Sequence, residues 1–173
     1  FLIDLSPGDM QDRLSDALSV YVDAMRYPRG TEDQRASMWL EHTRRQGWKA
    51  VAAVVVPDTR DSNTAQLSTA PIVGVAYGYC GAPDQWWQQQ VVAGLQRVGA
   101  DRSRIAELMT SYFELTELHI HPRAQGRGLG EALTRRLLAG RGESHVLLST
   151  PEINGESNRA WRPYRRPGFT EII

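Results

Sequence analysis

The segment with the clearest chemical character is the glycine-rich run over residues 125–130. It follows a strand-like stretch that ends at Pro122, and a helical pattern begins directly after it. Glycine lets a phosphate approach the backbone closely, and a helix N-terminus adds unpaired N–H donors and the positive end of a dipole. We therefore expect a pyrophosphate to bind the successive backbone N–H groups of this run, which are those of Gln125, Gly126, Arg127, Gly128, Leu129 and Gly130.

Other phosphate-binding turns fit this run less well. A dinucleotide-binding turn needs G-x-G-x-x-G and an acidic residue after the next strand, and a P-loop ends in G-K-[ST]. Here the glycine spacing is G-x-G-x-G, the next strand-like stretch ends in Ser149 and Thr150, and no lysine follows the glycines. A helix-start turn without any ligand remains the structural alternative.

Helices and strands alternate in the sequence around this run. Helical spacing of apolar residues predicts a helix over residues 9–26, and Thr31 with Gln34 forms a capping-box pattern for a second helix that ends near Gly47. Strands are expected over 48–56 and 72–80, joined by a polar loop over 58–70. Later elements are two helices, over 84–98 with Asp84 as its cap and over 101–112, then a strand over 113–121.

The C-terminal third continues the alternation. A helix is expected over 131–139, a strand over 145–150, a last helix over 158–166 and a further strand after Gly168 and Phe169. This order predicts mixed α/β packing around a central sheet. We expect one domain over residues 1–173, with a helical insert at about residues 82–112.

Composition excludes several classes of function. The chain has 173 residues, 41% of them hydrophobic, and a formal net charge of zero, so a nucleic-acid partner has no global electrostatic support. Cys80 is the one cysteine, which excludes an intrachain disulfide, and no metal-ligand spacing occurs. Apolar runs are too short to cross a membrane and no signal-peptide pattern is present, so we expect a cytoplasmic protein without a membrane partner.

Two coupled motifs resemble the coenzyme A signature of the GNAT (Gcn5-related) N-acetyltransferases. The first is Gln125-x-x-Gly128-x-Gly130, preceded by Leu118-x-Ile120-x-Pro122, and the second is Asn158-Arg159-Ala160, then Tyr164, then Gly168-Phe169. They match in order and in mutual distance, which is more specific than either motif alone. The resemblance implies a GNAT-like acyl-CoA N-acyltransferase fold of the α/β (α+β) class, with a central mixed, mostly antiparallel sheet flanked by helices.

The same resemblance implies transfer of an acetyl group from acetyl-CoA to a primary amine by direct attack, without a metal. The amine must lose a proton and the departing thiolate must gain one. Glu117 and Glu114 are the candidate bases, acting directly or through water, with His119 as a third candidate, and Tyr164 is the candidate acid. In a regular strand the two glutamates would point to opposite faces, so at most one reaches the amine unless a β-bulge re-aims the other.

The remaining implied contacts are with the cofactor and the acceptor. The pantetheine arm would lie along the backbone of Leu118, His119 and Ile120, and Asn158 would touch the pantetheine or the pyrophosphate. The acceptor would be a small-molecule or peptide amine, and a homodimer is compatible with the sequence. Ion-paired strand glutamates, an asparagine helix cap and a packed tyrosine are the structural alternatives. The functional alternative is a catalytically silent CoA-binding sensor or scaffold of the same fold.

Overall fold

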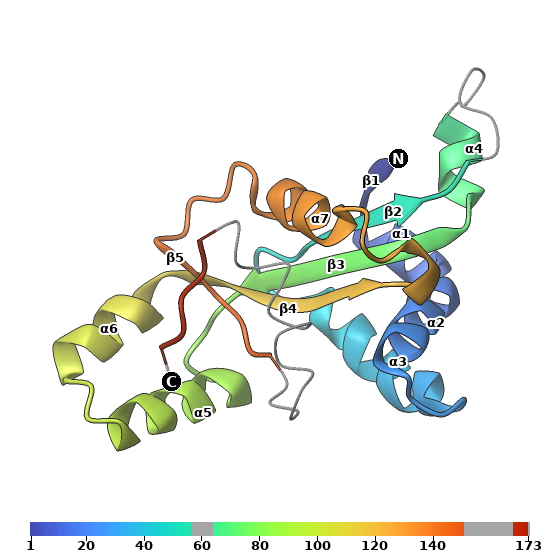
Figure 1. The fold of residues 1–173 in the computed structure, drawn as a ribbon. Coiled ribbons are helices and arrows are strands. Elements are labelled where there is room, and N and C mark those ends of the chain that lie inside the picture. Colours follow the sequence, from blue (N-terminus) through green and yellow to red (C-terminus); the bar gives the residue numbers. More distant parts are fainter. Residues whose placement is uncertain (57–63, 151–167, 173) are drawn as a thin grey trace.

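The fold is organised around one five-stranded sheet in a computed structural model that describes residues 1–56, 64–150 and 168–172 (Figure 1). The strands follow each other in chain order across the sheet, β1 (Leu2–Leu5), β2 (Lys49–Val54), β3 (Ile72–Cys80), β4 (Tyr112–Ile120) and β5 (His145–Leu147). The first four pair antiparallel and β5 pairs parallel to β4. The expected mixed, mostly antiparallel sheet is therefore confirmed.

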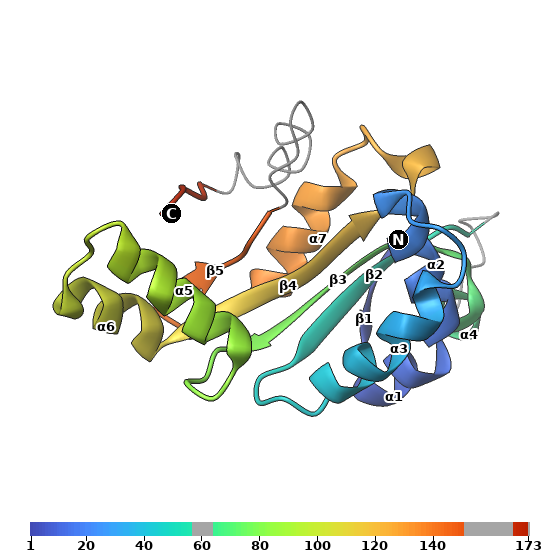
Figure 2. The ribbon, with the colours of Figure 1, turned by 90° about the horizontal axis from the view of Figure 1, so that it is seen from below.

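Helices cover both faces of this sheet. In chain order they are α1 (Pro7–Asp12), α2 (Leu14–Met25), α3 (Thr31–His42), α4 (Thr64–Thr69), α5 (Trp86–Arg97), α6 (Arg102–Thr110), the 3-10 turn η1 (Pro122–Ala124) and α7 (Leu129–Leu138). Figure 2 shows α1, α2 and α3 on one face and α7 on the other, while α5 and α6 extend beyond the sheet at the end where β4 begins. The glycine-rich run thus connects β4 to the helix that covers the opposite face.

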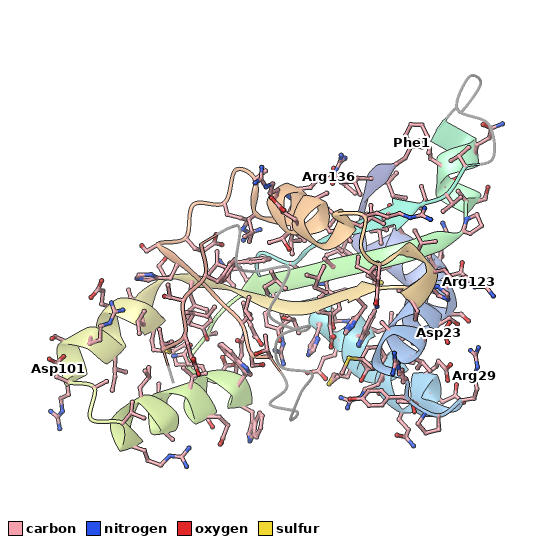
Figure 3. All side chains as sticks on the ribbon, in the orientation of Figure 1. Phe1, Asp23, Arg29, Asp101, Arg123 and Arg136 are labelled. Carbon is pink, nitrogen blue, oxygen red and sulfur yellow. The ribbon has the colours of Figure 1, made fainter. Side chains whose placement is uncertain are left out.

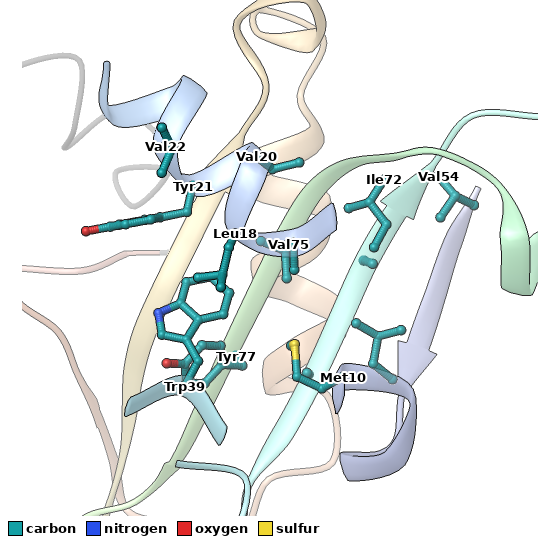
Figure 4. Packing of buried hydrophobic residues seen from close by; sticks show 14 of the residues in the cluster. Met10, Leu18, Val20, Tyr21, Val22, Trp39, Val54, Ile72, Val75 and Tyr77 are labelled. Carbon is teal, nitrogen blue, oxygen red and sulfur yellow. The ribbon is translucent and has the colours of Figure 1, made fainter. Parts of the chain in front are cut away.

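Each face of the sheet has its own apolar core. On the α2 side, Leu18 and Trp39 pack with Val75 and Tyr77 of β3 (Figure 4). On the α7 side, Leu133 and Leu137 are fully buried with Phe113 and Leu115 of β4, among others. The period of two along β2 and β3 separates these sets, so each of these two strands contributes apolar side chains to both cores.

Several boundaries differ from those expected. The helix over 9–26 is two helices that meet at Arg13, and β1, an edge strand of four residues, was not predicted. The capping box of Thr31 and Gln34 is wrong, because Gly30 is the N-cap of α3 in a left-handed conformation. The Thr31 hydroxyl instead donates to the carbonyl oxygen of Pro28.

Four further expectations are corrected or stay open. The cap of α5 is Gln85 rather than Asp84, and the polar loop over 58–70 contains the short helix α4. No strand occurs over residues 168–172, where one was expected to begin. The helix expected over 158–166, which carries Asn158 and Tyr164, lies outside the described residues.

Candidate active site

A bulge in β4 places Glu114 and Glu117 on the same face of the sheet. In the register with β3, Glu117 is opposite Tyr77 while Leu115 is opposite Gly78, so Thr116 is the extra residue of β4. Glu114 is opposite Tyr79. Because Tyr77 and Tyr79 are two residues apart in one strand, both glutamates face the side covered by α2 and α3. The β-bulge that the sequence analysis required for both carboxylates to share a face is therefore present.

Glu114 is a buried carboxyl group with a pKa near neutrality. Its side chain is only 4% exposed, and its Oε2 atom has no hydrogen-bond partner among the described residues. Burial raises the pKa of Glu114 to about 7, opposed by a hydrogen bond from Tyr79 and by the charge of Arg45. Nη1 of Arg45 also donates to the Tyr79 hydroxyl over 2.7 Å. A carboxyl group in this state can accept or release a proton at neutral pH.

Glu117 is held by a neighbouring imidazole. Its Oε2 atom forms a short contact with Nε2 of His119, two residues further along the strand. The His119 ring is 9% exposed, packs edge-on against Tyr21 with centroids 4.8 Å apart, and stacks over Trp39 at 6.4 Å. The aromatic side chains of α2 and α3 thus fix the ring that positions the Glu117 carboxylate.

A second buried imidazole completes this face. Nδ1 of His42 lies 2.8 Å from the Tyr77 hydroxyl, and burial lowers the pKa of His42 to about 4, so the ring is neutral at physiological pH. Burial is also the main reason that the pKa of Tyr77 is raised well above its usual value. The sequence did not single out His42, Arg45 or Trp39, which contact Tyr77 or Tyr79 on this face. The spacing of Tyr77 and Tyr79 along their strand indicates only that these two rings share a face.

The glycine-rich run has the backbone geometry of an open cradle. Gly126 and Gly128 have φ angles of +79° and +76°, a region that other residues rarely adopt, and Gly128 is the N-cap of α7. A Cβ atom added at either glycine would meet nothing within 4 Å, so both backbones face open space. The Gly128 cap forms no side-chain hydrogen bond, which leaves the first N–H groups of α7 open to an anion.

Side chains around the cradle suit a phosphate group. Nε2 of Gln125 donates to the carbonyl oxygen of Ile120 over 3.1 Å and so ties the run back to the end of β4. Arg123 and Arg127 are exposed, and neither forms an ion pair within the described part of the chain. These residues fit the pyrophosphate of coenzyme A, with N–H donors at the helix start and positive side chains beside them.

Among the described residues, the edge of β4 that leads from Glu114 to the cradle has no strand partner on the side away from β3. β5 pairs only with Tyr112, Phe113 and Glu114. Over residues 115–120, no other described strand pairs with β4 on the side away from β3. Within the described ranges, the backbone of Leu118, His119 and Ile120 thus has no strand on that side, while the side chains of Leu118 and Ile120 pack in the core on the α7 side of the sheet.

The described residues contain neither a candidate membrane-spanning helix nor a candidate metal site. None of these helices is both long enough and apolar enough to span a membrane. In the same ranges, no cluster of three or more histidine, cysteine or acidic side chains could hold a metal ion. Of the expected site residues, the structure places Glu114 and Glu117 on one face of β4, and the run over 125–130 follows the end of the same strand. Asn158 and Tyr164 lie outside the described residues.

Comparison with known proteins identifies relatives along the whole chain. No family model matches the sequence. The chain is 71% identical over 182 aligned residues to the GCN5-like protein acetyltransferase Rv2170 of Mycobacterium tuberculosis (strain ATCC 25618 / H37Rv), a match that covers 100% of this chain and 88% of the relative. This identity is far above the level at which a fold and a family are shared.

Solved structures of low sequence identity share the fold. An aminoglycoside acetyltransferase from an uncultured soil metagenomic sample superposes with a TM-score of 0.62 at 17% identity, covering 100% of this chain and 93% of that one. Aminoglycoside N-acetyltransferase AAC(6')-Iy in complex with CoA gives 0.59 at 13% identity, with 99% and 88% covered. A ribosomal-protein-alanine N-acetyltransferase from Brucella melitensis biovar Abortus 2308 gives 0.54 at 18%, with 99% and 92% covered. With its full-length relative at 71% identity, the chain belongs to the GCN5-related N-acetyltransferase family of acyltransferases.

Proposed function

We propose that this chain transfers an acetyl group from acetyl-CoA to a primary amine by direct attack within a ternary complex. The observation that carries the proposal is the bulge at Thr116, which aims two carboxylates at one face of the strand that leads into the glycine cradle. Membership of the acetyltransferase family supports it, as does the structural neighbour that binds CoA. Acetyl-CoA supplies the activated acetyl group as a thioester.

Glu114 is the favoured base. An alkylammonium acceptor must lose a proton before it can attack, and a carboxyl group with a pKa of about 7 is matched to that task at neutral pH. Glu117 is the second candidate, because its contact with His119 offers a route for a proton away from the amine. Tyr164, outside the described residues, remains the proposed acid for the thiolate.

The cofactor contacts follow the strand and the cradle. We assign the pyrophosphate to the N–H groups over residues 125–130 and the pantetheine arm to the open backbone edge at Leu118, His119 and Ile120. A backbone donor of this edge can also polarise the thioester carbonyl group. Asn158 stays a proposed contact of the pantetheine or the pyrophosphate. The proposed transfer gives no role to a metal ion.

The acceptor we propose is an amine on a protein or peptide. The relative at 71% identity is named a protein acetyltransferase, and one structural neighbour is named for an alanine of a ribosomal protein. Other neighbours are aminoglycoside acetyltransferases, so small polyamines and aminoglycosides form the second class to be tried.

The test measures CoA release and acceptor mass together. Acetyl-CoA is incubated with the protein and a panel of lysine peptides, peptides with a free N-terminus, and aminoglycosides. A gain of one acetyl group on an amine, matched by free CoA thiol, supports the proposal. Tyr164→Phe should lower kcat by about a hundredfold, a usual size for a lost general acid, while acetyl-CoA affinity changes little. Tight binding of acetyl-CoA without turnover on any amine would instead identify a silent CoA-binding module.

A further inference from the structure

Asp23, near the C-terminal end of α2, contacts two loops that are far apart in the sequence. Its Oδ2 atom lies 3.3 Å from Nε2 of His121, which follows the last residue of β4. Its other oxygen, Oδ1, lies 3.6 Å from Nη2 of Arg29 in the turn between α2 and α3. Figure 3 shows Asp23 between Arg29 and the η1 turn that carries Arg123. The carboxylate therefore joins the α2–α3 turn to the start of the glycine cradle.

His121 links the Asp23 carboxylate to the backbone of η1. Its Nδ1 atom accepts a hydrogen bond from the N–H of Arg123 over 3.2 Å. An imidazole nitrogen that accepts cannot carry the proton, so in the neutral ring the proton lies on Nε2, the atom that faces Asp23. The carboxylate thus selects the tautomer that can cap η1.

The opposite end of the turn is held separately. The side chain of Gln125 donates to the carbonyl oxygen of Ile120, so η1 is fastened by His121 at its start and by Gln125 at its end. Gly126 and Gly128 follow with left-handed backbone angles and no neighbour above them. Because glycines restrict the chain least, the path of the cradle depends on how η1 is held.

We propose that Asp23, acting through His121, is a positioning residue that holds the 125–130 cradle in the shape that binds coenzyme A. This rests on the proposed function, in which the cradle holds the pyrophosphate. A cradle held in the bound shape before the ligand arrives loses less conformational freedom on binding. Neither Asp23 nor His121 needs to touch the ligand for this effect.

Simple electrostatics and the positioning role predict opposite effects of Asp23 on CoA affinity. Asp23 is an anion close to a site for an anionic ligand, so removing its charge should by Coulomb's law tighten CoA binding. The positioning role predicts that Asp23→Asn weakens it instead. Asp23 and His121 are 29% and 27% exposed and border a hollow of about 350 Å³ between α2 and the start of β3, so water weakens the contact. We expect a rise in the CoA Kd of about two- to fivefold, in the range of a partly exposed ion pair.

The experiment uses the full chain and CoA as the titrant. Isothermal titration gives the CoA Kd of the parent, Asp23→Asn, His121→Ala and the double variant, and alanine leaves no side-chain acceptor for the Arg123 N–H. Asp16→Asn is the matched control, since it removes the same charge from the same helix but breaks only a contact with Arg13. The rate of amide hydrogen exchange over residues 123–128, measured without ligand, shows directly how firmly the turn is held. Both single variants should bind CoA more weakly than the parent, and the double variant should bind it no more weakly than either single variant. Exchange over residues 123–128 should be faster in Asp23→Asn than in the parent.

Three results would overturn the inference. One is a CoA Kd in Asp23→Asn that equals the parent's or is smaller, and another is a double variant whose loss is the product of the two single losses. The third is unchanged exchange over residues 123–128. A parent that does not bind CoA would refute the proposed function itself, and the exchange measurement would still decide whether Asp23 holds the turn.

Discussion

Replacing Glu114 by glutamine should change how the stability of the protein depends on pH. The folded protein holds the Glu114 proton up to about pH 7, whereas the unfolded chain releases it near the ordinary value of 4.5. Between these values the folded state binds more protons than the unfolded state, so the free energy of unfolding falls as pH rises. Above about pH 7 Glu114 is ionised in both states. The free energy that its burial as an anion costs the folded protein is then constant with pH. Glu114→Gln removes this penalty because an amide does not ionise.

The magnitude follows from the two pKa values. At about 1.36 kcal/mol per pKa unit, the full difference corresponds to ~3 kcal/mol, and ~2.5 kcal/mol of it develops between pH 5 and pH 8. Urea unfolding of the parent and Glu114→Gln at both pH values measures it. The variant should gain ~2.5 kcal/mol relative to the parent over this range. Any fixed cost of the amide at the buried Oε2 position cancels, because only the change with pH is compared.

The control and the refuting result are specific. Glu107→Gln removes an exposed carboxylate of α6 that pairs with Arg104 at 3.3 Å, and its unfolding free energy should follow the parent at both pH values. Groups such as His42 titrate equally in parent and variant and drop out of the difference. If the curves of Glu114→Gln and the parent run parallel from pH 5 to pH 8, Glu114 ionises normally, and the argument for it as a base matched to neutral pH fails. In turnover, Glu114→Gln should lose about a hundredfold or more.

Four other changes test the cradle, the insert and the core. Gly128→Val places a β-branched residue at a φ angle of +76° and should abolish the rise in melting temperature caused by acetyl-CoA, and a retained rise would place the site elsewhere. Trp86→Ala should change stability by less than about 0.5 kcal/mol, because the side chain is 71% exposed, but should raise the acceptor KM if α5 covers the acceptor. Trp87→Ala should destabilise more in urea unfolding, because that ring packs on Tyr112 with centroids 6.0 Å apart. Leu133→Ala, at a position with no exposure, should lose about 2–5 kcal/mol, and a smaller loss would show that the α7 core relaxes around the cavity.

Elements with a strong local pattern were predictable. The strand over 72–80 has the bounds that were expected, and β4 is displaced by one residue. The cradle is also local, since two glycines and the helix that follows suffice to open its N–H groups. The strand β1, which was not predicted, depends on pairing between strands that are far apart in the sequence. β1 has only four residues, too few for a pattern, and its place comes from its pairing with β2.

Local signals also failed where backbone geometry decided between neighbouring residues. Thr31 and Gln34 have the residue types of a capping box, yet Gly30 takes the cap because the chain enters α3 at a φ angle of +100°. A threonine at that position would be strained, since a β-branched residue resists positive φ. The type of cap therefore depends on the direction from which the chain arrives, which α2 and the α2–α3 turn determine.

The sequence by itself determined the family, the order of most elements and the cradle, because these depend on residue types at short, regular spacings. It also named Glu114 and Glu117 as candidate bases, and that role remains a prediction. Only the tertiary structure decided that both face the same side, because the bulge at Thr116 exists only in the register of β4 against β3. The pKa of Glu114 likewise depends on its burial and on Tyr79 and Arg45, which come close only when the segment after α3 packs against the sheet.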